Sequence, residues 1–228
     1  MGSMVSFPAN GGTSEGYLAS PASGNGPGVI VIQEWWGLND QIKGVADMFA
    51  REGFNALAPD FYHGKGAKIG EPDAAGKLMM ELKLDQAAKD ARGAAAYLTK
   101  HPATSSARVG VIGFCMGGGL ALFTAAEAAG EIAAVVDCYG VGPSVAAAAG
   151  RVKVPVLGIF GAQDHSVYPD GVTELEKSLS QAGAAFEKRV YQNAGHAFLN
   201  EQRTDVYRAD DAKEAWSRIT PFLKQHVR

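Results

Sequence analysis

Cysteine is scarce in this sequence: only Cys115 and Cys138 occur among 228 residues, both in or at the end of apolar, strand-like runs. Two isolated cysteines provide neither a spaced disulfide framework nor a zinc ligand set. No segment approaches the roughly 18 apolar residues that a membrane-spanning helix needs, and the N-terminus lacks the pattern of a secretory signal. We therefore expect a cytoplasmic protein with no metal, no cofactor and no membrane partner.

A strong charge of either sign is also missing, since 21 Lys and Arg against 24 Asp and Glu give a net charge of −3. This balance excludes the basic footprint that is typical of nucleic-acid binding. Chains of this length with α/β patterning routinely form one unit, so we expect a single domain over residues 4–228, as a monomer or small homo-oligomer. Residues 1–3, ahead of Met4, are typical of an expression-tag remnant.

Short runs rich in Val, Ile and Phe alternate with helix-like segments along the chain. The expected strands are 28–33, 54–58, 109–114, 133–138, 154–160 and 185–191, with 5–7 and 16–19 as an antiparallel entry. The expected helices are 38–52, 73–99, 117–128, 171–182 and 205–226. Continuous apolar strands indicate burial on both faces. The alternation therefore predicts an α/β fold with a mostly parallel central sheet and helices on both faces.

The run from Val109 to Gly119 contains Gly-x-Cys-x-Gly directly after an expected strand. In a nucleophile elbow the catalytic residue occupies a strained turn between strand and helix, and the flanking residues must be glycine because neighbouring backbone passes close by. Gly113 and Gly117 take those positions around Cys115. N–H groups at the start of the following helix favour a negative sulfur. Cys138 is expected to pack as a small hydrophobic residue.

Two further polar residues follow later strands in the order that a catalytic triad of this fold requires. Asp164 comes after the strand 154–160, and His196 comes after the strand 185–191. Asp164 alone would more often be a turn or helix-capping residue, and His196 alone is as typical of a loop as of catalysis. The order of nucleophile, acid and histidine predicts that a Cys115 thiolate attacks a carbonyl, while His196 moves protons and Asp164 orients its ring.

The segment after the first buried strand, Gln33-Glu34-Trp35-Trp36-Gly37, supplies further candidates. In this fold an oxyanion hole uses one N–H from that loop and one from the residue after the nucleophile, here Trp35 and Met116. Glu34 is unusual, because a carboxylate at the end of a buried strand is costly unless it is paired or functional. An ion pair with an arginine is the structural alternative for Glu34.

Five ordered motifs carry a resemblance to one family: 33–37, 58–62, 113–118, 161–165 and 195–198. They resemble the dienelactone hydrolases, the carboxymethylenebutenolidases of the α/β-hydrolase superfamily, over nearly the whole chain. The resemblance implies a cofactor-independent esterase or lactonase with Cys115 as nucleophile and Asp164 and His196 completing the triad. It also implies that Glu34 holds the resting thiol and helps to convert it to thiolate when substrate binds.

The match fails where family members bind the carboxylate of the lactone. They place one arginine shortly after the triad histidine and another before the long helix, whereas this chain has Asn200 and Glu71 in those neighbourhoods. Arg203 lies near, but an exposed position at a helix start explains it as well. The natural substrate is therefore left open, with Trp36, Tyr62, Phe198 and Asn200 as candidate pocket residues, although such aromatics are often core.

The sequence thus predicts a hydrolase that cleaves a small ester or lactone through an acyl-thioester intermediate. The alternative is a non-catalytic or redox-responsive protein that keeps the fold and uses Cys115 as an oxidisable thiol. Such a sensor would need neither Asp164 nor His196. A dinucleotide-binding protein is disfavoured, because Gly113 to Gly119 does not have the Gly-x-Gly-x-x-Gly spacing.

Overall fold

A computed structural model describes residues 2–228, within which one eight-stranded sheet is flanked by seven helices. The strands are β1 (Ser3–Ala9), β2 (Gly12–Ala19), β3 (Gly28–Ile32), β4 (Asn55–Pro59), β5 (Val109–Phe114), β6 (Ile132–Cys138), β7 (Val156–Gly161) and β8 (Phe186–Tyr191). The helices are α1 (Asp40–Arg51), α2 (Pro72–Glu81), α3 (Leu84–Lys100), α4 (Met116–Glu127), α5 (Pro143–Ala149), α6 (Asp170–Ala182) and α7 (Ala209–His226).

The strand order is β1-β2-β4-β3-β5-β6-β7-β8. The pairs from β4 through β8 are parallel, while β1 pairs antiparallel with β2 and β2 antiparallel with β4. Every residue of β3, β5, β6 and β7 is buried, as expected for strands covered on both faces. The predicted fold class and the antiparallel entry are confirmed.

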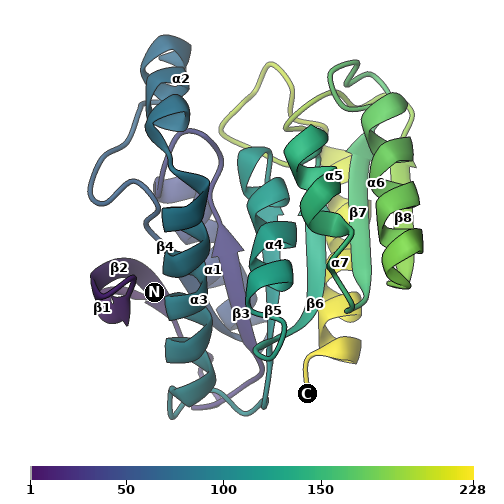
Figure 1. The fold of residues 1–228 in the computed structure, drawn as a ribbon. Helices are drawn as coiled ribbons and strands as arrows, with labels where there is room; N and C mark the ends of the chain where they lie inside the picture. The colour runs from purple at the N-terminus through teal and green to yellow at the C-terminus, as the bar shows by residue number, and fades with distance from the viewer. Residues whose placement is uncertain (1) are drawn as a thin grey trace.

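Helices cover both faces of the sheet (Figure 1), and each layer has its own hydrophobic core. On one face α3, α4 and α6 bury their apolar sides, and α5 packs against α4 and α6. On the other face α1 and α7 pack against the sheet around Phe49, Phe114 and Ile219. The two layers hold the sheet rigidly, and the ends of its parallel strands meet at one edge.

One expected helix differs from the structure, and one observed helix was not expected. The helix predicted over 73–99 is interrupted at Leu82 and Lys83, whose backbone is extended, so that α2 and α3 are separate. No proline or glycine marks this break, and Leu82 instead turns inward against the core. The structure also contains α5, which begins at Pro143 in the Ala- and Gly-rich stretch 140–150, where no helix is expected from the sequence. Other boundaries shift by a few residues, the largest being the start of α7 at Ala209.

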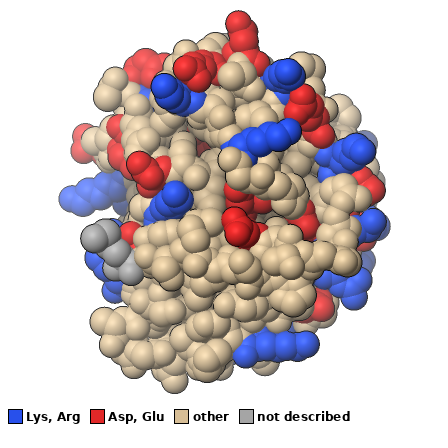
Figure 2. Space-filling model, turned by 90° about the vertical axis from the view of Figure 1, so that its left-hand side faces the viewer, with Lys and Arg blue, Asp and Glu red and all other residues tan. Residues whose placement is uncertain are grey.

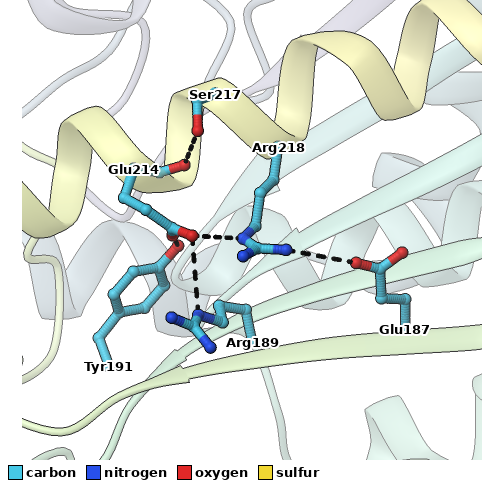
Figure 3. A network of polar contacts seen from close by, with 6 residues as sticks. All are labelled: Glu187, Arg189, Tyr191, Glu214, Ser217 and Arg218. Carbon is cyan, nitrogen blue, oxygen red and sulfur yellow. Dashed lines mark hydrogen bonds and ion pairs between the residues drawn. The ribbon is translucent and has the colours of Figure 1, made fainter.

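Side chains of α7 hold the last strand in place (Figure 3). The Glu214 carboxylate accepts hydrogen bonds from the Tyr191 hydroxyl and, at 2.5 Å, from Arg218 Nε, and it lies 3.8 Å from Arg189 Nε. The Arg218 guanidinium also lies 3.9 Å from a carboxylate oxygen of Glu187 on β8. Because β8 leads directly into the segment that carries His196, this network fixes the base of a candidate catalytic loop.

Charges are mixed on the molecular face that carries β1, β2 and α2 (Figure 2). Basic and acidic side chains alternate over its upper half, and its lower half is largely uncharged. A surface of mixed charge does not form the continuous basic patch that is typical of a nucleic-acid-binding face. Among residues 2–228, no helix is both long and apolar enough to cross a membrane.

Candidate active site

Cys115 lies in a tight turn between β5 and α4, with a strained backbone of φ 56° and ψ −121°. A non-glycine residue with positive φ costs about 1–3 kcal/mol and persists only where its surroundings impose it. Here the Cys115 N–H donates to the Cys138 carbonyl at 2.9 Å, and the Gly118 N–H donates back to the Cys115 carbonyl at 2.9 Å. The turn therefore presents the thiol at the carboxyl edge of the sheet.

The flanking glycines are required by close backbone contacts, as the sequence predicts. A Cβ on Gly113 would lie 1.8 Å from the Gly117 carbonyl oxygen, and one on Gly117 would lie 2.4 Å from the carbonyl oxygen of Gln33. Neither contact is sterically possible, and both partners are backbone atoms that cannot move aside. The first turn of α4 thus packs directly on the end of β3, which brings Cys115 near Glu34.

His196 and Asp164 lie beyond the ends of β8 and β7 and contact each other. Nδ1 of His196 is 2.5 Å from Oδ2 of Asp164, and the other carboxylate oxygen accepts a hydrogen bond from the Ser166 hydroxyl at 2.6 Å. Burial raises the Asp164 pKa, but the hydrogen bonds from His196 and Ser166 outweigh it and lower that pKa overall. Asp164 is therefore an ionised, almost fully buried partner for the imidazole.

The His196 ring also meets the thiol. Burial lowers the His196 pKa, but hydrogen bonds with Asp164 and with Cys115 outweigh this effect and raise the pKa to about 10. His196 and Cys115 line the same cavity, so the imidazole faces the space that the thiol opens onto. The structure thus brings together Cys115, His196 and Asp164, which lie on three different segments of the sequence.

Glu34 is 3% exposed and has partners other than the thiol. Its Oε2 accepts a hydrogen bond from Asn200 Nδ2 at 2.8 Å, and its Oε1 accepts one from the Tyr139 hydroxyl at 3.4 Å. Within residues 2–228 no hydrogen bond joins Glu34 to Cys115, and no arginine pairs with the carboxylate. Burial raises the Glu34 pKa, opposed first by the Asn200 hydrogen bond and then by the charge of His196.

Tyr139 belongs to this site but was not singled out from the sequence. Its backbone has φ 48°, its ring packs edge-on against His196 with centroids 5.2 Å apart, and its hydroxyl reaches Glu34. The turn that holds it is closed by the Gly140 N–H, which donates to Asp137 Oδ1 at 2.8 Å. The available signal was its position, since Tyr139 directly follows β6, the strand beside β5.

The two N–H groups expected to form the oxyanion hole, those of Trp35 and Met116, lie at positions without regular backbone hydrogen-bond acceptors. Met116 is the first residue of α4, where N–H groups have no acceptor within the helix. Trp35 follows β3, and its N–H donates no hydrogen bond in the part of the chain that the structure describes. Both amides are therefore available to a ligand, and the packing of Gly117 on Gln33 holds their segments together.

A cavity of about 410 Å³ opens above Cys115 and His196. Of the four pocket residues expected from the sequence, none lines this cavity directly. The Tyr62 hydroxyl contacts Met116 Sδ at 3.5 Å, one layer behind the cavity wall. Phe198 is fully buried between Tyr139 and Tyr191, Asn200 binds Glu34, and Trp36 packs in a separate small cluster with Ala67 and Ala75.

Among the described residues, no group of three or more His, Cys, Asp or Glu side chains is arranged to hold a metal ion. Cys138 is fully buried at the end of β6, where burial and the neighbouring Asp137 and Glu34 charges raise its thiol pKa. The two cysteines therefore occupy contrasting environments: Cys115 is partly exposed beside an imidazole, and Cys138 is enclosed and lies among carboxylates.

A mostly parallel sheet between helix layers, with a strained residue on a strand-to-helix turn, defines the α/β-hydrolase class. The sequence profile of the dienelactone hydrolase family matches residues 14–227. Protein usf of Aquifex pyrophilus is 41% identical over 233 residues, with all of both chains covered. A protein of Aquifex aeolicus named "Putative carboxymethylenebutenolidase" is 37% identical over 234 residues, again with all of both chains covered.

A solved structure named "Putative Dienelactone Hydrolase", from Klebsiella pneumoniae, superposes with a TM-score of 0.88 at 29% identity and covers 99% of each chain. The chain therefore belongs to the dienelactone hydrolase family. It is a hydrolase of the dienelactone hydrolase type, which confirms the resemblance and the enzyme class expected from the sequence.

Proposed function

We propose that the chain hydrolyses an ester or lactone through a Cys115–His196–Asp164 triad and an acyl-thioester intermediate. The observation that carries the proposal is the 2.5 Å contact between the Asp164 carboxylate and the His196 imidazole, which lines one cavity together with the Cys115 thiol at the strained turn. A redox sensor would not require this arrangement, because oxidation of a thiol needs neither a buried carboxylate nor an oriented imidazole.

In the proposed reaction the Cys115 sulfur attacks the carbonyl carbon, and the oxyanion accepts hydrogen bonds from the Trp35 and Met116 N–H groups. The carbon–oxygen bond to the leaving group breaks, and His196 gives that alkoxide its proton. Water then attacks the thioester while His196 takes one of its protons. The carboxylic acid leaves and Cys115 returns to its starting state, so no oxidant or cofactor is consumed.

Glu34 and Tyr139 act in this scheme as positioning residues. The Tyr139 ring packs on His196, and its hydroxyl is tied to Glu34, which Asn200 holds from the other side. This chain of contacts limits the tilt of the imidazole relative to the thiol. Control of the resting thiol by a direct Glu34 contact, which the family resemblance implies, would require Glu34 or Cys115 to move, because no hydrogen bond joins them among the described residues.

Rates of p-nitrophenyl ester hydrolysis by wild type, Cys115→Ala, Cys115→Ser and Cys138→Ala test the proposal. We expect Cys115→Ala to lose at least about a thousandfold in kcat, since a nucleophile and its base act as one unit. Cys138→Ala should keep the activity. Acid quenching within one turnover should trap an acyl adduct on Cys115 that hydroxylamine removes. Equal rates in all four proteins would refute the triad, and reversible oxidation of Cys115 without any turnover would favour a sensor.

A further inference from the structure

The wall of the cavity above Cys115 is mostly apolar and, among residues 2–228, carries no charged side chain other than that of His196. Within the described chain, none of its lining residues is Lys, Arg, Asp or Glu. Apart from the catalytic pair and backbone glycines, the polar side chains that line it are those of Tyr139, Ser144 and Ser166. Ser166 donates to Asp164, and Tyr139 donates to Glu34, so both hydroxyl protons are already used. Such a cavity offers area for apolar burial and little for a charged group.

Exposed apolar side chains continue this wall out to the solvent. Only four large hydrophobic residues are exposed among residues 2–228, and two of them, Met79 and Leu84, line this cavity. They lie on either side of the break between α2 and α3, with Phe123 of α4 also in the wall. An apolar rim next to a reactive thiol is costly in water unless a ligand covers it.

Arg203, the candidate cation that the sequence offers near Asn200, is not free to bind an anionic substrate. Arg203 lies close enough to Glu34 and Cys115 for their charges to raise its pKa, but the Asp205 hydrogen bond is the largest cause of that shift. Its Nε and a terminal nitrogen donate to the two Asp205 oxygens at 2.9 and 2.6 Å. A substrate carboxylate would have to displace Asp205, and Asn200 is already bound to Glu34.

We propose that this enzyme takes uncharged esters or lactones whose apolar portion fills the cavity and extends over Met79 and Leu84, and that it discriminates against substrates with a carboxylate there. This inference rests on the proposed function, because it assumes that Cys115 reacts with the bound carbonyl. A desolvated carboxylate without a cationic or hydrogen-bonded partner is strongly disfavoured, whereas each buried methylene is favourable.

Two matched substrate comparisons test the proposal. From p-nitrophenyl acetate through butyrate to hexanoate, we expect kcat/KM to rise by about fourfold for each added methylene. This factor corresponds to the free energy of moving one methylene from water into an apolar site. Against p-nitrophenyl hexanoate, the hydrogen adipate ester has the same number of acyl carbons and a terminal carboxylate. We expect its kcat/KM to be at least about tenfold lower. Equal values, or faster turnover of the adipate ester, would overturn the proposal.

Variants at the rim separate a specific contact from general hydrophobicity. Met79→Ser and Leu84→Ser should flatten the dependence of kcat/KM on acyl chain length. Met80→Ser is the matched control, because Met80 is the next residue of α2, is 80% exposed and does not line the cavity. The same loss in Met80→Ser as in Met79→Ser would overturn the rim assignment.

Ser144→Arg supplies a cation at an exposed position of the cavity edge and should raise the relative rate on the adipate ester, with Ser144→Gln as the uncharged control. If Ser144→Arg hydrolyses the adipate ester no faster than Ser144→Gln, the assignment of this cavity as the substrate site is contradicted. All comparisons are repeated in Cys115→Ala. Hydrolysis that survives there refutes the proposed triad, whereas Cys115-dependent hydrolysis that prefers the anionic ester refutes only the substrate class.

Discussion

The hydrogen bond between Asn200 and Glu34 is expected to stabilise this protein in a pH-dependent way. Both side chains are buried, at 0% and 3% exposure, and the bond of 2.8 Å has a carboxylate acceptor. Hydrogen bonds to charged groups contribute about 1.5–3 kcal/mol. Asn200→Asp retains an acceptor for the Gln202 N–H but replaces the donor facing Glu34 with a second carboxylate. We expect it to cost about 3 kcal/mol or more at pH 8.

The direction of the pH effect follows from the Glu34 pKa, which burial raises in the folded state. A group with a raised folded pKa contributes stability that is fully present below its unfolded pKa and is lost as the pH rises through the folded value. A second carboxylate raises the Glu34 pKa further. The deficit of Asn200→Asp should therefore be smaller at low pH, where uptake of a proton relieves the repulsion between the two carboxyl groups, and should grow toward pH 8.

Urea denaturation followed by tryptophan fluorescence at pH 5, 6.5 and 8 measures this difference, since the chain has three tryptophans. The control is a double-mutant cycle with Glu34→Gln, whose side-chain amide can donate to the new carboxylate. In that background Asn200→Asp should cost much less at pH 8. A destabilisation that is independent of pH and unchanged in the Glu34→Gln background would show that Asn200 acts on stability through something other than Glu34.

Three further predictions concern the triad and its supports. Asp164→Asn should lower the His196 pKa, followed by NMR, well below the value of about 10 to which its hydrogen bonds raise it. The raised pKa of His196 stabilises the folded protein at low pH, and this contribution is lost as the pH rises through about 10. The substitution should therefore destabilise the protein more at pH 7 than at pH 10.5. Gly118→Ala would place a Cβ 2.2 Å from Asp137 Oδ1 and should cost about 3 kcal/mol in urea titrations, whereas Gly76→Ala on α2, which meets nothing within 4 Å, should stabilise by about 0.5–1 kcal/mol. Tyr191→Phe should lower the stability by about 1–2 kcal/mol through loss of the bond to Glu214, an effect that disappears in a Glu214→Ala background, where the acceptor is absent.

Sequence reasoning reached the fold and the order of the reactive residues because both are encoded locally. Continuous apolar runs mark β3, β5, β6 and β7, and the glycines around Cys115 mark a turn that no other residue type could form. The break at Leu82 escaped prediction because its local sequence suits a helix, and only contacts with the core make the extended backbone favourable there. Similarly, nothing local distinguishes the aromatic ring of Phe198, which is core, from one that lines a pocket.

The sequence by itself determined which groups are present at the sheet edge: a thiol on a strained turn, then a carboxylate and an imidazole, each directly after a strand. Parallel strands bring such ends together whatever the details of packing. Only the tertiary structure decided what each group contacts. Glu34 meets Tyr139 and Asn200, which lie 105 and 166 residues away in sequence, and the apolar cavity wall combines side chains of α2, α3 and α4. These contacts depend on how distant segments are placed in space, and the local periodicity of the sequence does not specify that placement.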